Sequence, residues 1–342
     1  MTLLQRTAAL ACMTALAACS TAGGDTGAGQ GGALPDAGPT CTPPDAQPGR
    51  GPSGYPLDGW SWVRHGVVLQ DAAAAADDGY IAPALVAVGD TLHLWVTRKQ
   101  GLVHRILHST STDGLSFTTP EPTAGLDGQD VIAYPSALFD GTRFLMWYGS
   151  GSIDLAASSD GVSWSMVASG VLGPGGAGAF DSLTVLYPSV VSRNPGYTMM
   201  YTGFDGQRFA IGAALSQDGV LWDRPVATPL LEHGVAGEFD NHAVAMPCGV
   251  SSGPRLLLWY GGYDTSQTDP GPYRVGLASS VDGVSFQRQG VTLDLEPSGV
   301  EAYSTRDPAV TRWQGRWWMG YVGMGDDRRY RILTASSDTC GN

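Results

Sequence analysis

Six acidic residues, one histidine and several tyrosines stand at fixed distances before a recurring proline. The prolines are Pro83, Pro135, Pro188, Pro247 and Pro308. The residues seven positions before the prolines are Ala76, Gly128, Asp181, Asp240 and Glu301. The residues five positions before them are Asp78, Asp130, Leu183, His242 and Tyr303. The residues directly before them are Ala82, Tyr134, Tyr187, Met246 and Asp307. Side chains separated by even numbers of residues share one face of a strand. Carboxylates gathered on one face are suited to general acid–base chemistry, so these positions are the candidates for a site.

Asp307 is the first candidate for a catalytic role, because Arg306 precedes it and Pro308 follows it. A neighbouring guanidinium keeps a carboxylate ionised and oriented. An internal salt bridge is the alternative interpretation of this pair. His242 is a candidate for orienting a ligand, and its alternative is a hydrogen-bonded core histidine. The other candidates for ligand binding are Arg306, Tyr303, Tyr134, Tyr187 and Glu301.

The other acids are catalytic candidates with structural alternatives. Asp181 and Asp240 occur in matching contexts, Gly-Ala-Phe-Asp and Gly-Glu-Phe-Asp, so they could instead bond backbone N–H groups at the entry of a strand. Asp78 and Asp130 each precede an apolar run and could be turn residues. The acids of four Asp-Gly pairs are predicted to be structural, because tight hairpins require such pairs: Asp113, Asp160, Asp218 and Asp282.

These positions recur because the chain consists of repeats. Successive prolines are 52, 53, 59 and 61 residues apart (135−83, 188−135, 247−188, 308−247). Each repeat has a proline-containing strand and an aromatic or apolar second strand, and four of them continue to an Asp-Gly turn followed by an aromatic residue. Repeats of about 40–60 residues with four short strands are typical of β-propeller blades. The sequence predicts an all-β, five-bladed β-propeller with four-stranded antiparallel blades and inward-facing first strands.

The fifth repeat ends before a fourth strand. Its missing turn and aromatic residue occur near the other end of the chain, as Asp58-Gly59-Trp60-Ser61-Trp62. We therefore expect the N-terminal segment to supply the outer strand of the last blade and to close the ring. A chance match in an aromatic-rich chain is the alternative.

The first 54 residues divide into two segments. Residues 1–18 combine Arg6 with a short apolar run and are predicted to be a signal peptide. Leu16-Ala17-Ala18-Cys19 resembles a bacterial lipobox, which implies that Cys19 is lipidated and anchors the protein in the cell envelope. An ordinary signal peptide is the alternative. Residues 19–54 lack apolar periodicity and are predicted to be a flexible tether before a propeller of residues 55–342.

Three cysteines remain beyond the signal peptide and Cys19. Cys41 and Cys340 flank the two strands expected to meet at the seam, so we predict a disulfide between them. Cys248 lies in an apolar strand and is expected to be a buried thiol. No Cys/His cluster has the spacing of a zinc site, and no cofactor is expected other than a structural calcium ion that the acidic channel could hold.

The charge of the chain narrows the class of partner. The net charge is −13, with only 19 Lys and Arg residues. Nucleic acid and anionic lipid require a basic face, so neither is expected, and membrane contact is expected only through the lipid on Cys19. An acidic, aromatic-rich surface suits neutral sugars, and we expect a monomer.

The repeats resemble those of a known superfamily. Met-Trp-Tyr-Gly at 146–149 and Ala-x-Ser-x-Asp-Gly-x-x-Trp at 156–164 are similar to motifs of the five-bladed propellers that include arabinanases, invertases, levansucrases and mannoside phosphorylases. The resemblance covers residues 58–338. Arg306-Asp307-Pro308 is similar to the Arg-Asp-Pro element of the invertase-like families, which implies that Asp307 steadies an oxocarbenium-like transition state. The chain departs from those families at Ala82, where they have an Asp, and its middle repeats offer only Glu238 as a possible acid.

Two functions follow as hypotheses. The first is a glycoside hydrolase at the cell envelope, in which two of the acids act on a glycosidic bond. A phosphorylase is disfavoured because few basic residues occupy the aligned positions. The second is a surface lipoprotein without catalytic activity that binds a carbohydrate or a protein.

Overall fold

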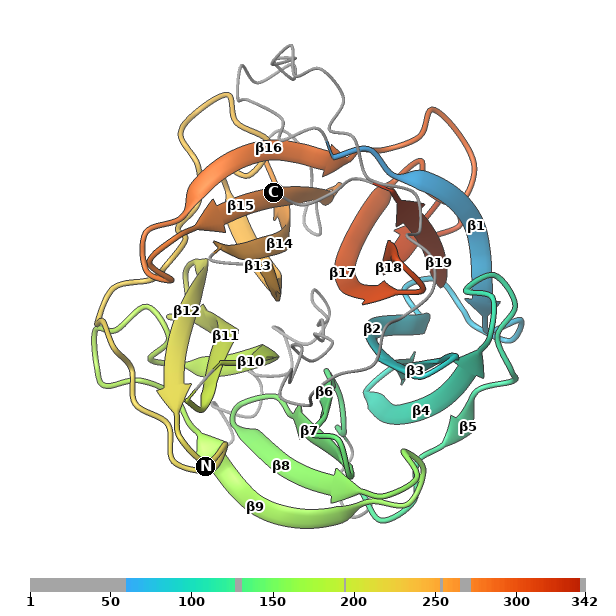
Figure 1. The fold of residues 1–342 in the computed structure, drawn as a ribbon. Helices are drawn as coiled ribbons and strands as arrows, with labels where there is room; N and C mark the ends of the chain where they lie inside the picture. The colour runs from blue at the N-terminus through green and yellow to red at the C-terminus, as the bar shows by residue number, and fades with distance from the viewer. Residues whose placement is uncertain (1–59, 127–130, 194, 253–254, 265–271, 339–342) are drawn as a thin grey trace, which may run out of the picture.

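The computed structural model describes residues 60–126, 131–193, 195–252, 255–264 and 272–338. These residues form strands, turns and loops, and they contain no helix that could cross a membrane. The strands group into sheets around a common centre, with the first strand of each repeat innermost (Figure 1). No sheet closes on itself within the described ranges, so the ring is built from separate antiparallel sheets packed side by side.

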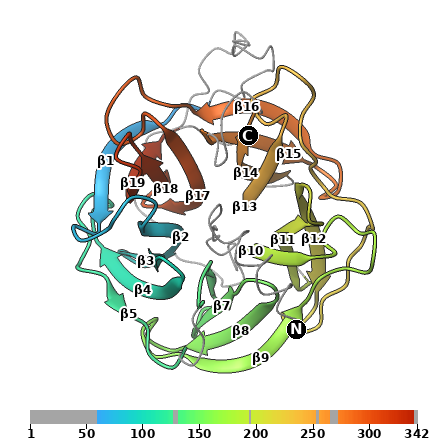
Figure 2. The same ribbon diagram turned by 180° about the vertical axis from the view of Figure 1, so that it is seen from behind.

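Three sheets each correspond to one repeat. The second repeat forms β6 (Ser136–Phe139), β7 (Phe144–Tyr148), β8 (Ile153–Ser158) and β9 (Ser165–Leu172). The third forms β10 (Thr184–Ser192), β11 (Tyr197–Phe204) and β12 (Phe209–Ser216). The fourth forms β13 (Ala243–Ser252), β14 (Arg255–Tyr263), β15 (Arg274–Ser280) and β16 (Gln287–Leu293). Neighbouring strands pair antiparallel, as expected for hairpin-connected repeats (Figure 2).

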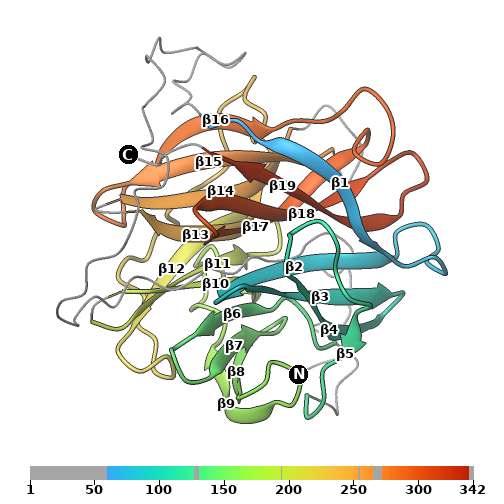
Figure 3. The same cartoon turned by 45° about the vertical axis from the view of Figure 1, so that its right-hand side comes forward.

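The first and fifth repeats share one larger sheet. The first contributes β2 (Gly79–Val88), β3 (Thr91–Gln100), β4 (Val103–Ser111) and β5 (Glu121–Pro122), and the fifth contributes β17 (Ser304–Trp313), β18 (Arg316–Met324) and β19 (Tyr330–Ser337). A single parallel pair, Tyr330 with Gly79, joins them. The N-terminal strand β1 (Val63–Gln70) runs antiparallel to β19 on the outside of the ring (Figure 3). The N-terminal segment thus pairs with the last strand, although the strand begins after the Asp58–Trp62 element.

A bulge interrupts the first strand at its proline in four repeats, and in the second repeat β6 begins directly after Pro135. The residue before the proline has a positive φ in all five repeats, between 55° and 63°: Ala82, Tyr134, Tyr187, Met246 and Asp307. The pairing with the second strand shifts register at this point in β2, β10, β13 and β17. Proline has no N–H to give to the ladder, and a bulge re-aims the side chain beside it. The bulge therefore sets where the pre-proline side chain points.

Side chains tie successive first strands to one another. The residue after the proline accepts a hydrogen bond from a backbone N–H of the next repeat, from Val190 to Ser136 Oγ and from Gly249 to Ser189 Oγ, both at 2.9 Å. In the fourth repeat the corresponding residue is Cys248, whose Sγ accepts from the Val310 N–H at 3.2 Å. These contacts are buried. The inner strands are therefore held in a fixed order around the centre.

The predicted structural role of the Asp-Gly turns is confirmed. In each turn the aspartate accepts hydrogen bonds from the backbone N–H groups two and three residues further on, as Asp160 does from Val162 and Ser163. These backbone donors lower the pKa of Asp160 to about 2. The turn also packs on the preceding repeat, where Trp95 Nε1 donates to the Gly161 carbonyl at 2.8 Å. The turns therefore serve blade-to-blade packing rather than a site.

Candidate functional site

Three of the sequence-predicted site residues meet at the centre of the ring. Tyr134, Tyr187 and Asp307 are each completely buried, together with Ala82 and Met246 from the same position of the other repeats. The Tyr134 and Tyr187 ring centroids are 4.2 Å apart. Burial, Tyr134 and the negative charge of Asp307 raise the pKa of Tyr187 well above its ordinary value. We call these five pre-proline residues the axial cluster.

Asp307 is the charged member of the axial cluster, and Arg306 is its ion-pair partner. Arg306 Nε lies 3.0 Å from Asp307 Oδ1, and the side chains are 1% and 0% exposed. Asp307 Oδ2 also accepts from the Ala82 N–H at 3.3 Å, which links the fifth repeat to the first. Burial acts to lower the pKa of Arg306, but Asp307 and the surrounding tyrosines raise it above its ordinary value. The guanidinium therefore stays charged and holds the carboxylate in one orientation.

A second set of charges lies at the seam between the fifth and first repeats. Asp78 Oδ1 is 3.3 Å from Lys99 Nζ and accepts from the Gly101 N–H at 2.8 Å. Tyr330 stands between this pair and the axis, with Lys99 Nζ 6.0 Å and Arg306 Cζ 5.6 Å from its ring. Burial raises the pKa of Tyr330, and Asp307 is among the charges that act on it. The carboxylates that act on Tyr330 are Asp77 and Asp307, and Asp78 contacts Tyr330 through its backbone carbonyl, which accepts from the Tyr330 N–H at 3.0 Å.

Tyr303 and Asp77 extend this environment outward. Arg328 covers the Tyr303 ring, with its Cζ 4.4 Å from the centroid, and its Nη2 lies 3.0 Å from Asp77 Oδ1. Tyr303 and Arg328 are partly exposed, so they border the solvent. The predicted ligand-binding residue Tyr303 therefore lies on the outer part of the site, held by a cation that the sequence alignment did not select.

A row of rings connects His242 with the axis. His242 is exposed, and its ring is 5.0 Å from Tyr263, which in turn is 4.6 Å from Tyr273. Arg306 Cζ lies 4.8 Å from the Tyr273 ring. His242 is therefore a rim residue rather than the core histidine of the alternative interpretation. Rings that lie beside a guanidinium and a carboxylate offer both stacking and hydrogen-bonding surfaces to a sugar.

Asp181 and Asp240 lie apart from the axis, in matching clusters within their own repeats. Asp181 accepts from the Tyr201 hydroxyl at 2.8 Å and from Arg224 Nε at 2.9 Å. Asp240 has the same partners one repeat later, Tyr260 at 2.8 Å and Arg288 at 2.9 Å. Both aspartates are completely buried. These contacts favour a structural role for the two Phe-Asp motifs, but the partners are tyrosine and arginine side chains and not the backbone N–H groups expected from the sequence.

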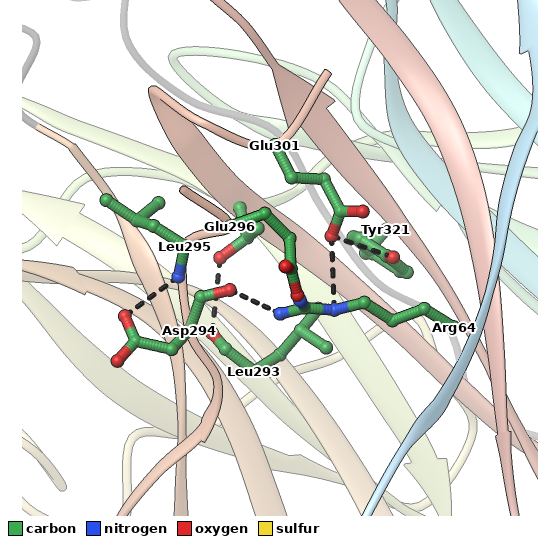
Figure 4. Close-up of polar contacts among 8 residues, drawn as sticks. Arg64, Leu293, Asp294, Leu295, Glu296, Glu301 and Tyr321 are labelled. Atoms are coloured by element: carbon green, nitrogen blue, oxygen red, sulfur yellow. Dashed lines mark hydrogen bonds and ion pairs between the residues drawn. The ribbon is translucent and has the colours of Figure 1, made fainter. Parts of the chain in front are cut away.

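Glu301 occupies the equivalent place in the fifth repeat (Figure 4). Its Oε1 accepts from the Tyr321 hydroxyl at 3.0 Å and lies 3.3 Å from Nε of Arg64, a residue of β1. Arg64 also contacts the Asp294 carbonyl and the Glu296 carboxylate. Burial raises the pKa of Glu301, and Arg64 and Tyr321 act against that rise. We call each of these three groups a carboxylate–tyrosine–arginine triad.

The triads correct the expectation that all aligned acids face one cavity. Asp181, Asp240 and Glu301 precede the strands, which begin only at Thr184, Ala243 and Ser304. The two-residue alternation of a strand does not extend into the preceding loop. In addition, the bulge changes the direction of the pre-proline residue. Only the pre-proline positions therefore converge, and the acids seven residues earlier turn toward the second strand of their own repeat.

Some predictions fall outside the described residues, and one concerning a cysteine is wrong. Asp130, Cys19, Cys41 and Cys340 lie outside the described ranges. Cys248 is completely buried as expected, but it takes part in a disulfide bond and is not a free thiol. The apolar sequence around Cys248 does not indicate a disulfide, because a disulfide-bonded cysteine and a free cysteine are equally suited to a core.

Sequence reasoning missed most of the cations and rings around Asp307. Lys99, Arg328, Tyr273 and Tyr330 come from second and third strands or from the loops before them, whereas the alignment covered first strands only. The sequence could have indicated two of these residues through a charged run, Asp326-Asp327-Arg328-Arg329-Tyr330-Arg331. This run concentrates charge in a chain with few basic residues. Within the described ranges, no group of three His, Cys, Asp or Glu side chains is arranged to hold a metal ion.

Comparisons by sequence give distant relatives. No protein-family model matches the chain. It is 28% identical over 198 residues to an uncharacterized protein of Mycobacterium tuberculosis, a match that covers 56% of this chain and 63% of the relative. It is 31% identical over 124 residues to a sucrose-6-phosphate hydrolase of Zymomonas mobilis, which covers 35% of this chain and 23% of that enzyme. The matches therefore span less than two thirds of each relative.

Comparisons by structure define the fold. The chain is similar to a glycoside hydrolase (TM-score 0.67, 15% identity, 83% of this chain and 93% of the other). It is also similar to a protein described with the GH130 family of mannoside phosphorylases and hydrolases of β-1,2-mannosidic linkages (0.60, 17%, 80% and 93%). A third similar structure is an α-L-arabinofuranosidase from Podospora anserina (0.61, 12%, 81% and 96%). The chain thus has the all-β, propeller-type fold of these glycoside hydrolases.

Proposed function

We propose that this chain is a five-bladed β-propeller that acts as a glycoside hydrolase on a poly- or oligosaccharide. The five-blade count rests on the five repeats and on β1, which adds a fourth strand to the fifth repeat. The activity rests on one observation: Arg306 and Asp307 lie among Tyr134, Tyr187 and Tyr330 at the centre of a fold shared with glycoside hydrolases. A carboxylate held beside aromatic rings suits a transition state with developing positive charge.

The proposed chemistry uses two carboxylates of the described site and a third, Asp130, outside the described residues. Asp307, oriented by Arg306, would stabilise positive charge at the anomeric carbon. Asp78, held by Lys99 and the Gly101 N–H, is the second carboxylate within the described site and would act as base or nucleophile. Asp130 remains a sequence-based candidate for the acid. Tyr303 and His242 at the rim would bind the sugar chain.

The test is a hydrolysis screen over neutral oligosaccharides, run with and without inorganic phosphate. We expect reducing ends to appear without phosphate, and Asp78→Asn to lower kcat at least about 100-fold, as removal of a general acid or base does. Tyr303→Phe is the matched control, because it keeps the ring beside Arg328 and should change KM more than kcat. Turnover that requires phosphate would replace hydrolysis by phosphorolysis, and full activity of Asp78→Asn would remove Asp78 from the mechanism.

A binding protein without catalytic activity is the second candidate. The observation that favours it is the complete burial of Asp307, whose two oxygens both have partners in Arg306 and the Ala82 N–H. The same screen separates the two functions. Binding of an oligosaccharide by wild-type protein without any product over a long incubation would support the binding function.

We also propose that the protein is anchored in the bacterial cell envelope through a lipid on Cys19. The support is the sequence alone, Leu16-Ala17-Ala18-Cys19 followed by a Gly- and Pro-rich tether. In cells, the wild-type protein should partition into the detergent phase, and Cys19→Ser should move it to the aqueous phase. Equal partitioning of both proteins would contradict the anchor.

A further inference from the structure

The second repeat lacks the triad of the repeats that follow it. In the third and fourth repeats, the arginine stands opposite Ala214 or Ala278, and the tyrosine pairs with a glycine two residues before that alanine. The same register in the second repeat gives Tyr148, paired with Asp154, and Met166, opposite Ala156. The tyrosine is kept, the arginine is replaced by methionine, and the acid position is Gly128 in the sequence.

The space around this tyrosine differs as well. In the third repeat Phe180 packs over Gly212, where an added Cβ would lie 2.4 Å from the ring, and Phe239 packs over Gly276 in the same way. The position equivalent to these glycines is Asp154 in the second repeat. Asp154 thus places a carboxylate at the position where the third and fourth repeats have a glycine, over which a phenylalanine ring packs.

A cavity of about 340 Å³ lies at this place. Polar groups dominate its wall: Tyr148, Asp154, Ser150, Ser152 and Ser169, with Met166 at its edge. Its volume falls in the range of small-molecule pockets, about 300–1,000 Å³. Tyr148 is only 5% exposed, and among the described residues its hydroxyl has one hydrogen-bond partner, Met166 Sδ at 3.9 Å. A buried phenol with so weak a partner offers its hydrogen bond to a ligand.

The wall determines the class of ligand. None of the described residues that line the cavity is basic, so an anion is disfavoured. Asp154 Oδ1 already accepts from the Gly170 N–H at 2.7 Å, which leaves few strong acceptors for a cation. Burial and then Asp154 raise the pKa of Tyr148 to about 12, so the phenol is a donor at neutral pH. Three serine hydroxyls, which both donate and accept, complete the set.

We propose that this cavity is a second carbohydrate site, which binds one neutral sugar ring in the second repeat, at the position where the following repeats have their triads. Asp154 and Tyr148 would bond adjacent hydroxyls of the ring, and Met166 would cover its apolar face. The proposal does not depend on hydrolysis at the centre, because the ligand is a single ring without a bond to cleave.

The test measures binding of free D-glucose, D-mannose, D-galactose and L-arabinose by saturation-transfer NMR. We expect at least one sugar to bind with a dissociation constant on the order of 1 mM. Asp154→Asn and Tyr148→Phe should each weaken that binding about tenfold. Met166→Arg should abolish it, because it places a guanidinium where Arg224 and Arg288 lie in the other repeats and fills the cavity.

Val167→Arg is the matched control, since it adds the same side chain to the neighbouring, exposed position of β9, whose side chain points to the other face. It should bind like the wild type. A thermal melt of each variant verifies that it is folded. The proposal is overturned if no sugar binds the wild type at about 100 mM, or if Met166→Arg and Asp154→Asn bind with unchanged affinity.

Discussion

At the scale of single residues, the buried pair Arg306 and Asp307 is expected to have a large effect on stability. Removing one partner of a buried ion pair costs about 3–5 kcal/mol, because the other charge stays in the interior. We expect Asp307→Asn to lower the free energy of unfolding by about that amount, measured by urea unfolding. The free energy of unfolding should fall less in the double variant Arg306→Met/Asp307→Asn than in Asp307→Asn. A stable Asp307→Asn protein would mean that the charge is not needed for folding. Any loss of activity in that variant could then be assigned to catalysis and not to unfolding.

Two buried histidines predict a loss of stability in mild acid. His104 and His108 are 1% and 9% exposed, and burial is the main cause that lowers the pKa of each to about 4. The unfolded chain binds these protons near pH 6.5, whereas the folded chain binds them near pH 4, so folding becomes less favourable as the pH falls between these values. The contribution is about 3 kcal/mol per histidine at most. Urea unfolding at pH 7.0, 5.5 and 4.5 measures the effect.

His108→Gln serves as the control for that pH dependence. It keeps a polar partner for His93, whose Nδ1 lies 3.0 Å from His108 Nε2, but it removes the titrating group. The decline of stability between pH 6.5 and pH 4.5 should become shallower in this variant. An unchanged slope would exclude His108 as one of its causes.

At the scale of elements, the hydrogen bonds between first strands hold the repeats together. Ser189 Oγ accepts from the buried Gly249 N–H, so Ser189→Ala leaves that donor without its partner. We expect a loss of about 1–3 kcal/mol of unfolding free energy. Ser189→Cys should lose less, since Cys248 is the natural acceptor at the same position of the next repeat. Ser192→Ala, at an exposed position, should leave the unfolding free energy unchanged. Equal stability of all three variants would show that these hydrogen bonds do not stabilise the protein.

The elements also show what sequence could and could not predict. Pro308 and its four counterparts reveal the first strands, and the Asp-Gly pairs reveal the turns, because each has a local backbone requirement. The same alignment predicts that Tyr134, Tyr187 and Asp307 converge. It fails for Asp181, because the partners Tyr201 and Arg224 lie 20 and 43 residues further along the chain. The loops between strands vary in length, so such partners have no fixed spacing to detect.

At the scale of the whole molecule, Arg64 joins the N-terminal strand to the fifth repeat. It is the arginine of the third triad, but it comes from β1 rather than from the same repeat (Figure 4). We expect Arg64→Met to destabilise the protein by about 1–3 kcal/mol at pH 8, because Glu301 loses its counter-charge. The loss should shrink at pH 5, since burial already raises the pKa of Glu301 and the acid can take up a proton.

Hydrogen exchange locates that effect. In Arg64→Met, the amides of β1 and β19 should exchange faster, whereas those of β11 should not change. Arg224→Met is the matched variant within a single repeat, and it should instead accelerate exchange in β11 and β12. Equal protection of β19 in wild type and Arg64→Met would contradict a role of this arginine in closing the ring.

The pairing of β1 with β19 has a consequence for how the chain is made. Contacts such as His65 with Ser336 join residues 271 positions apart, so β1 is synthesised long before its partner β19. Until β19 has been synthesised, β1 lacks this partner, and an unpaired strand edge favours aggregation. Long-range pairing of this kind slows folding. We therefore expect correct folding of this protein to require that β1 stays unpaired with other chains until β19 has been synthesised.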